Sequence, residues 1–199
     1  MTMILRYSIA SPYARKVRIA ASIAGLADSI DVAGVDLVDP ADSIRVQNPL
    51  GKIPTLILDD GSTLYDSRVI VEYLDHLAGG GKLVPGETAA RFSTLRLQAL
   101  GDGICDAALL LRYESVLRTE AQRSPDWIAL QQGKIDRALD YAEGAPPQGP
   151  RDAGHIALAC ALGYLDMRFD GRWRDSRPAL VAWLEAFAAE VPAFDATKA

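Results

Sequence analysis

A serine, a proline and a tyrosine stand together in the stretch "SIASPYARKVRI" at residues 8–19. Ser11 suits the N-cap of a helix, and Pro12 suits its first position, where the missing N–H is not needed. This helix start follows the first predicted strand, where free backbone N–H groups and the helix dipole favour anionic groups. Ser11 therefore has two interpretations: a structural cap alone, or a hydroxyl that donates to a bound anion.

Two further stretches place a proline or polar residues at the boundaries of predicted strands and helices. In "NPLGKIPTLILDD", Pro54 opens a strand, at its first position or on a sheet edge. A trans bond is the commoner case, whereas a cis bond would turn the backbone of Ile53 outward to pair with an extended peptide. In "LYDSRVIVEYLD", Asp66 and Ser67 lie where the hairpin gives way to a helix. They either cap this helix or together hold an ammonium and a carboxylate group.

The elements that position these residues alternate over the first 78 residues. The strands are "MILRYS", "IDVAGVDL", "PTLILDD" and "STLYD". Helices are predicted over residues 12–25 and 67–77, and a short or irregular helix over residues 40–46. The resulting order is βαβαββα. The turn "DDG" is too short for a crossover, so the last two strands form an antiparallel hairpin added to a parallel βαβ unit.

The rest of the chain has helical periodicity. The stretch "AGGGKLVPGE" has the composition of a linker, and helices are predicted over residues 87–119, 125–143, 152–169 and 178–190. We therefore predict an α/β domain at residues 1–78, a linker at 79–86 and an all-helical domain at 87–199.

Composition excludes several classes of partner. The 199 residues are 49% hydrophobic, and 21 basic and 26 acidic residues are mixed along the chain for a net charge of -5, so no nucleic acid partner is expected. Cys105 and Cys160 lie in apolar helical patterns, which indicates neither a disulfide framework nor a metal site and fits a reduced cytoplasm. No apolar run reaches the length of about 18 residues that a membrane span needs, and no cleavable leader is expected.

In this order and spacing, "SPYARKVRI", "NPLGKIPTLILDDG" and "LYDSRVIVEYLD" resemble the cytosolic glutathione S-transferases, and "ALGDGICDAALLLRYE" is similar to the fourth helix of the bacterial members. The resemblance covers nearly the whole chain. It implies an α/β plus all-α fold, with a thioredoxin-like βαβαββα domain followed by an all-helical domain. It also implies a homodimeric, serine-type enzyme of detoxification, which conjugates glutathione, its co-substrate, to a small electrophile. The alternative is a binding or regulatory module of the same fold without turnover.

The resemblance also implies roles for single residues. Ser11 would hydrogen-bond the glutathione sulfur. The other implied glutathione contacts are the backbone of Ile53 before a cis Pro54, Asp66 and Ser67 at the γ-glutamyl end, and Lys52 at the glycyl carboxylate. A second substrate would lie between the domains, where Arg112 favours an anionic or polarised electrophile. The candidate lining residues there are Ala10, Tyr13, Asp102, Ile104, Asp106, Arg112 and Tyr113.

Two positions depart from the family pattern. Some bacterial relatives carry a cysteine near the first helix start, but this chain has Ala10 and Ser11, and a serine cannot form the mixed disulfide that thiol transfer needs. At the start of the sixth helix, Asp152 caps well, but His155 stands where the family has an aspartate. An imidazole there is a poorer partner for the backbone, so we expect the helix to form with some loss of stability.

Overall fold

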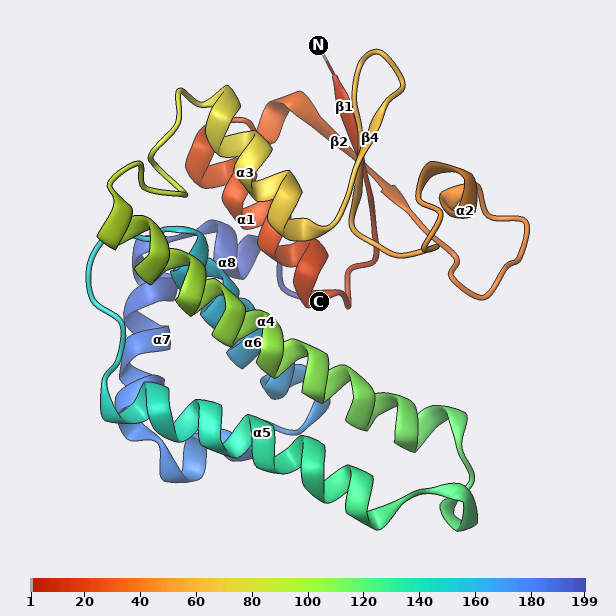
Figure 1. Ribbon diagram of the computed structural model, residues 1–199, viewed down its shortest axis with the longest axis vertical. Helices are drawn as coiled ribbons and strands as arrows, with labels where there is room; N and C mark the ends of the chain where they lie inside the picture. The colour runs from red at the N-terminus through yellow and green to blue at the C-terminus, as the bar shows by residue number, and fades with distance from the viewer. Residues whose placement is uncertain (1) are drawn as a thin grey trace.

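The structure, a computed structural model, describes residues 2–199 and has two parts that follow each other along the chain (Figure 1). The first part holds a four-stranded sheet of β1 (Met3–Tyr7), β2 (Ile30–Gly34), β3 (Thr55–Ile57) and β4 (Thr63–Leu64). The strands lie in the order β2-β1-β3-β4; β1 and β2 are parallel, and β3 is antiparallel to both of its neighbours. This topology confirms the predicted parallel unit with an added hairpin.

Two helices of the first part cover one side of the sheet. Helices α1 (Pro12–Ala24) and α3 (Ser67–Leu77) lie next to each other there, and α2 (Ile44–Gln47) lies on the other side (Figure 1). Ser11 caps α1, and Gly25 ends it at a φ of 76°, a left-handed conformation that glycine adopts without strain. The sheet and these two helices enclose a buried apolar core that includes Leu5, Val17, Ala20, Leu56, Ile70 and Leu74.

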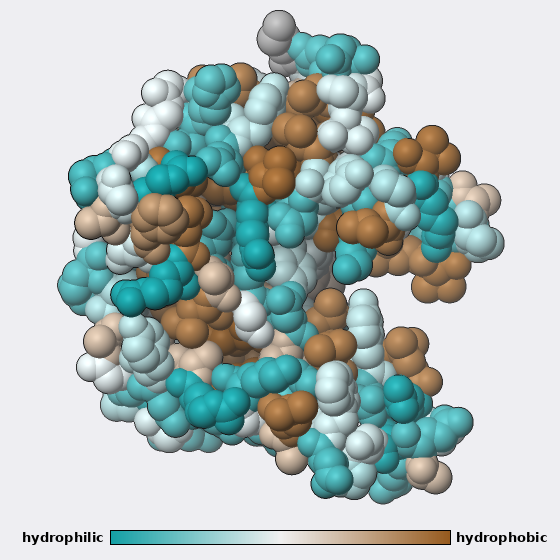
Figure 2. Space-filling view, in the orientation of Figure 1, coloured by the Kyte–Doolittle hydropathy of each residue, from teal (hydrophilic) through white to brown (hydrophobic). Residues whose placement is uncertain are grey.

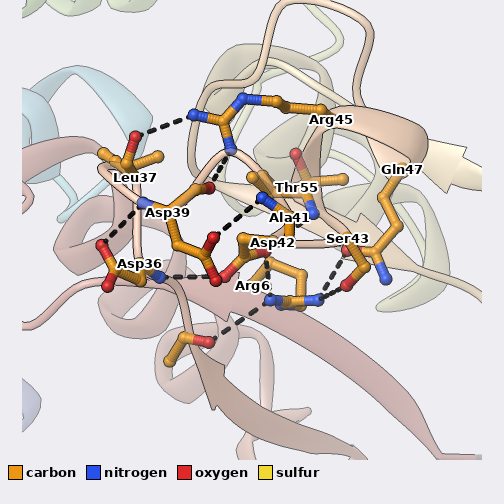
Figure 3. Close-up of polar contacts among 12 residues, drawn as sticks. Arg6, Asp36, Leu37, Asp39, Ala41, Asp42, Ser43, Arg45, Gln47 and Thr55 are labelled. Carbon is orange, nitrogen blue, oxygen red and sulfur yellow. Dashed lines mark hydrogen bonds and ion pairs between the residues drawn. The ribbon is translucent and has the colours of Figure 1, made fainter.

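The helix predicted over residues 40–46 is wrong in its bounds, because α2 begins only at Ile44. The carboxylates of Asp36, Asp39 and Asp42 each accept a backbone N–H from the residue two positions further on. Figure 3 shows the bond from Ala41 to Asp39. Such local bonds compete with the helical pattern, so they hold the chain in successive turns and delay the helix.

Arg6 on β1 ties this segment to the sheet (Figure 3). Its guanidinium donates to Ser43 Oγ at 2.8 Å, to Gln47 Oε1 at 2.7 Å and to the Asp42 carboxylate at 3.0 Å. The loop that follows α2 lines the cleft between the two parts of the molecule. Arg6 therefore positions one wall of that cleft against the central strand pair.

The second part consists of helices, as the periodicity predicts. They are α4 (Thr88–Leu117), α5 (Pro125–Gly144), α6 (Ala153–Arg168), α7 (Pro178–Glu190) and α8 (Ala193–Ala196), and the four long ones agree with the predicted bounds within two residues. The pattern does not predict α8 or the 3₁₀ turns at residues 27–29, 120–122 and 172–176, because such short segments show no period. Within residues 2–199, no helix combines the length and apolar character that a membrane crossing needs.

Helix α6 is the central helix of the second part and is buried along most of its length. It crosses α4 at Gly101, where an added Cβ would lie 2.5 Å from the carbonyl carbon of Ala157. Only a residue without a side chain lets the two backbones approach this closely. The close crossing holds α4 firmly, and α4 in turn carries one wall of the cleft.

The start of α6 forms as expected, but His155 acts differently from a backbone cap. The Asp152 carboxylate accepts the backbone N–H groups of Gly154 and His155, and the imidazole Nδ1 lies 2.7 Å from the same carboxylate. Thr94 on α4 donates to its other oxygen at 2.5 Å. Burial alone would raise the pKa of Asp152, but these bonds outweigh it and lower the pKa. His155 therefore supports the N-cap of α6 by contacting the Asp152 carboxylate that forms it.

Cys105 and Cys160 are buried free thiols on α4 and α6, the two helices that pack together. Burial raises the pKa of Cys105 and raises that of Cys160 to about 12. A thiol reacts as its thiolate, so both side chains serve as core residues at neutral pH.

Candidate functional site

A cleft of about 740 Å³ opens between the two parts, and the surface is visibly hollowed there (Figure 2). Its walls come from the loop after β1, the loop after α2, the starts of α1 and α3, and one face of α4. The residues predicted to bind glutathione or a second substrate come together around it: Ala10, Ser11, Tyr13, Lys52, Ile53, Pro54, Asp66, Ser67, Asp102, Asp106, Arg112 and Tyr113. Ile104 is the exception; it is 1% exposed in the core, because it lies on the face of α4 that turns inward.

Ser11 presents its hydroxyl to this cleft from the N-terminus of α1. Its Oγ accepts the backbone N–H of Ala14 at 3.2 Å, which makes it the helix cap. A hydroxyl has one proton and two lone pairs, and capping uses a lone pair only. The two interpretations of Ser11 are therefore compatible: the cap orients the side chain, and the proton remains available to an acceptor in the cleft.

Helix α3 also starts at the cleft. Asp66 is its N-cap and accepts the backbone N–H of Arg68 at 2.8 Å, and Ser67, its first residue, is buried. The starts of two helices thus face one cleft, each with free N–H groups and the positive end of a helix dipole. A ligand with anionic groups at two points suits this arrangement.

The wall between these two helix starts is the loop that carries Lys52 and Ile53. The bond between Ile53 and Pro54 is cis, so of the two alternatives left open by the sequence the less common one holds. Asn48, which is 1% exposed, donates to the carbonyl of Lys52 at 2.9 Å and to Thr55 Oγ1 at 3.2 Å. These two hydrogen bonds from Asn48 hold the loop in place. The sequence pattern gives no sign of this role.

A triad of charged residues, two of them buried, lies at the cleft and joins the two parts. Lys16 Nζ on α1 lies 2.7 and 2.9 Å from the two Asp102 oxygens, and Arg68 Nε lies 2.9 Å from one of them. The side chains of Lys16 and Asp102 are only 1% and 4% exposed, whereas that of Arg68 is 54% exposed. Asp102 thus lines the cleft as predicted, but its carboxylate is already bonded by two cations.

Tyr13 and Asp106, both predicted to line the second-substrate region, are bonded to each other. The Tyr13 hydroxyl on α1 donates to the Asp106 carboxylate on α4. Burial raises the pKa of Tyr13, and the neighbouring negative charge and this hydrogen bond raise it further, so the phenol stays protonated. This bond is a second link across the cleft.

The far end of the cleft contains residues that the sequence does not indicate. Arg112 and Tyr113 are joined there by Leu109, Val116, Tyr164 and Arg168. Tyr164 and Arg168 belong to α6, whose pattern marks it as a core helix. Only the packing of α6 against α4 brings its last turn to the cleft, so no local sequence signal could have found these two residues.

Comparison with known proteins gives one consistent result. Residues 10–77 match the family model "Glutathione S-transferase, N-terminal domain", and residues 125–186 match "Glutathione S-transferase, C-terminal domain". The uncharacterized GST-like protein YibF of Escherichia coli is 36% identical over 144 residues, which cover 69% of this chain and 71% of YibF.

Three solved structures of two proteins are similar over almost the full chain. A glutathione transferase family member from Pseudomonas fluorescens, crystallised with bound glutathione, is 39% identical, with a TM-score of 0.90 and coverage of 99% of this chain and 98% of that one. A second structure of that family member contains S-(propanoic acid)-glutathione, with a TM-score of 0.87. A glutathione S-transferase from Methylobacillus flagellatus, also with glutathione bound, is 37% identical, with a TM-score of 0.90 and 99% coverage of both chains.

Proposed function

Because the chain belongs to the glutathione S-transferase family, we propose that it binds glutathione in the cleft and transfers its thiolate to a small electrophile. The observation that carries this proposal is the Ser11 hydroxyl, held in the cleft at the start of α1 with its proton available for a hydrogen bond. Two similar proteins that contain bound glutathione support the choice of ligand.

The energies of the interactions at Ser11 suffice for ionisation of the bound thiol. A free cysteine thiol has a pKa of about 8.5, and lowering this pKa by about two units requires about 2.7 kcal/mol. A hydrogen bond to a charged acceptor contributes about 1.5–3 kcal/mol, and a helix N-terminus contributes about 0.3–1 kcal/mol. The Ser11 hydroxyl and the start of α1 supply these two interactions.

The reaction then needs no covalent bond to the protein. The thiol proton leaves to solvent, and the sulfur attacks an electrophilic carbon to form a carbon–sulfur bond. In a substitution, the leaving group departs with the electron pair of its bond to that carbon. The contribution of the protein is ionisation of the thiol and positioning of the two reactants.

The rest of glutathione spans the wall between the two helix starts. Its γ-glutamyl carboxylate faces the start of α3 at Ser67, and its ammonium faces the Asp66 carboxylate. The cysteinyl backbone pairs with the main chain of Ile53, and the glycyl carboxylate meets Lys52. All these residues line the one cleft that also contains Ser11.

Calorimetry with glutathione, combined with turnover of a chlorinated dinitrobenzene, tests the proposal. We expect glutathione to bind and the chloride to be displaced. Binding without turnover on a broad panel of electrophiles would favour the alternative, a binding or regulatory module of the same fold. Absence of glutathione binding would contradict the proposed transferase and leave only a module that holds no glutathione.

Replacement of Asp66 separates its role in binding from its role as a cap. Asp66→Ala and Asp66→Asn both remove the charge that faces the glutathione ammonium, so we expect each to raise the glutathione KM more than it lowers kcat. Asparagine still caps a helix, so only Asp66→Ala loses about 1 kcal/mol of unfolding free energy. Steady-state kinetics and thermal melting measure the two effects. An unchanged KM in both variants would leave Asp66 with capping alone.

We also propose that the protein is a homodimer at micromolar concentration. Helix α4 is 30 residues long, and a chain of this size cannot cover it alone. Large apolar side chains remain exposed on α4 and α5, among them Phe92 at 64% and Tyr141 at 60%. Sedimentation equilibrium should give twice the chain mass, and Phe92→Glu should shift the protein toward monomer. A monomeric parent protein would refute this proposal.

A further inference from the structure

Two arginines line the far end of the cleft. Arg112 projects from α4 and Arg168 from the last turn of α6, and both line the cleft beyond Ser11. Among residues 2–199, neither guanidinium takes part in any of the ion pairs of the structure. Two uncompensated positive charges in a concave site favour a ligand that carries negative charge.

Three carboxylates of the described residues line the same cleft, and none forms an ion pair with either arginine. Asp66 caps α3 and faces the glutathione ammonium in the proposed function. Asp102 is bonded by Lys16 and Arg68. Asp106 accepts the Tyr13 hydroxyl and lies six residues before Arg112, a rise of about 9 Å along the helix.

Tyr164 lines the same cleft as the two arginines. Burial raises the pKa of its hydroxyl, and the positive charges of Arg168 and Arg112 oppose that rise. Apolar side chains of Leu109 and Val116 line the same region and can contact the uncharged body of a small ligand.

We propose that the second substrate is a small electrophile that carries a carboxylate, an inference that rests on the proposed function. Arg112 and Arg168 bind this carboxylate, and the reacting carbon points toward the thiolate beside Ser11. Guanidinium groups match carboxylates in geometry and form charge-assisted hydrogen bonds with them. The two arginines thus select the charge of the second substrate, whereas the other unpaired charges of the cleft, Lys52 and Asp66, face glutathione in the proposed function.

Conjugate addition to an α,β-unsaturated acid shows how the arginines also act on the reaction. The thiolate sulfur bonds to the β-carbon, the carbon–carbon π bond breaks, and its electrons move toward the carboxylate. The α-carbon then takes one proton from solvent, so glutathione and acrylate give the propanoic acid S-conjugate with no other product. Negative charge grows on the carboxylate during this step, where the two arginines stabilise it.

Binding of two conjugates that differ only in charge tests the inference. The probes are the propanoic acid S-conjugate of glutathione and its propanamide, measured by calorimetry on the full-length protein. A charge-assisted hydrogen bond corresponds to about tenfold or more in affinity, so we expect the acid to bind at least about tenfold tighter than the amide. Arg112→Gln and Arg168→Gln should each reduce this ratio, and the double variant should abolish it.

Arg172→Gln provides the matched control. This residue lies four positions after Arg168, is 81% exposed at its side chain and does not line the cleft, so the acid-to-amide ratio should stay at the parent value. Steady-state rates of glutathione addition to acrylate and to acrylamide should show the same preference for the acid. Each rate is first divided by the rate of the uncatalysed reaction with the same substrate.

The outcomes separate this inference from the function on which it rests. Equal binding of acid and amide by a protein that binds glutathione overturns the inference alone. A preference for the acid that persists in the double variant overturns it as well, because other groups then hold the carboxylate. Failure of glutathione itself to bind overturns the proposed function and this inference with it.

Discussion

Replacing Asp102 with alanine lowers the free energy of unfolding by about 3–5 kcal/mol, because it leaves the ammonium of Lys16 buried without a counter-charge. Lys16 is 1% exposed, and both of its short contacts, at 2.7 and 2.9 Å, go to this carboxylate. Urea unfolding followed by circular dichroism measures the loss. Since the pair links α1 to α4, we expect the unfolding midpoint to fall for both parts of the molecule.

Two further variants assign this loss to the buried charge. Arg68→Gln removes the partner whose side chain is 54% exposed, so it should cost about 1 kcal/mol or less. The double variant Lys16→Met with Asp102→Leu removes both charges and should recover most of the stability, because well-packed apolar residues often replace a buried pair without loss. A loss below about 1 kcal/mol in Asp102→Ala would show that water reaches Lys16 and that the triad is not needed for stability.

Elements with chemical markers at their ends could be predicted from the sequence. Helix α3 begins at Ser67 after its Asp66 cap, and α7 begins at Pro178, as predicted, because these residues restrict where a helix can start. The antiparallel hairpin followed from a turn too short for a crossover. Each of these signals lies within a few residues of the feature that it predicts.

Features that depend on residues far apart in the sequence could not be predicted. Lys16 and Asp102 are 86 positions apart, and each alone looks like an ordinary charged residue on a helix. The bond between Tyr13 and Asp106 spans 93 positions. The late start of α2 had local causes, but side-chain bonds such as those of Asp36 compete with a helix only when the chain already turns there.

The same distinction applies to the site. The residues that we propose for glutathione binding were predicted and line one cleft, because a helix cap, a strand-opening proline and a second helix start occur in short stretches. Arg168 was not, since it ends a helix whose pattern indicates only core. The half of the cleft that would choose the electrophile was therefore predicted only in part: the sequence indicated Arg112 and Tyr113, but not Tyr164 and Arg168.

Ser11→Ala should leave glutathione binding nearly intact and lower kcat at neutral pH by about tenfold or more, since the bound thiol loses its hydrogen bond and its pKa rises. A thiol with a higher pKa is less ionised at a given pH, so the acid limb of the kcat profile moves to higher pH. Calorimetry measures the binding, and the absorbance of the bound thiolate measures its pKa.

The cap requires a control, because Ser11 also accepts the N–H of Ala14. Ser11→Ala should lower the free energy of unfolding by about 1 kcal/mol through loss of the cap. Ser11→Asn keeps a capping side chain without the hydroxyl, and Ser11→Thr keeps both. We expect Ser11→Asn to lose activity while it retains stability, and Ser11→Thr to retain much of both.

A cysteine at the same position tests whether the hydroxyl is what excludes disulfide chemistry. In Ser11→Cys, the start of α1 should lower the pKa of the new thiol, and its thiolate can attack a glutathione disulfide, release one glutathione thiolate and keep the other as a mixed disulfide. We expect this variant to gain reduction of small glutathione disulfides and lose conjugation. If Ser11→Ala keeps the parent kcat and pH profile, the hydroxyl serves only as a cap, and backbone N–H groups at the start of α1 must stabilise the thiolate instead.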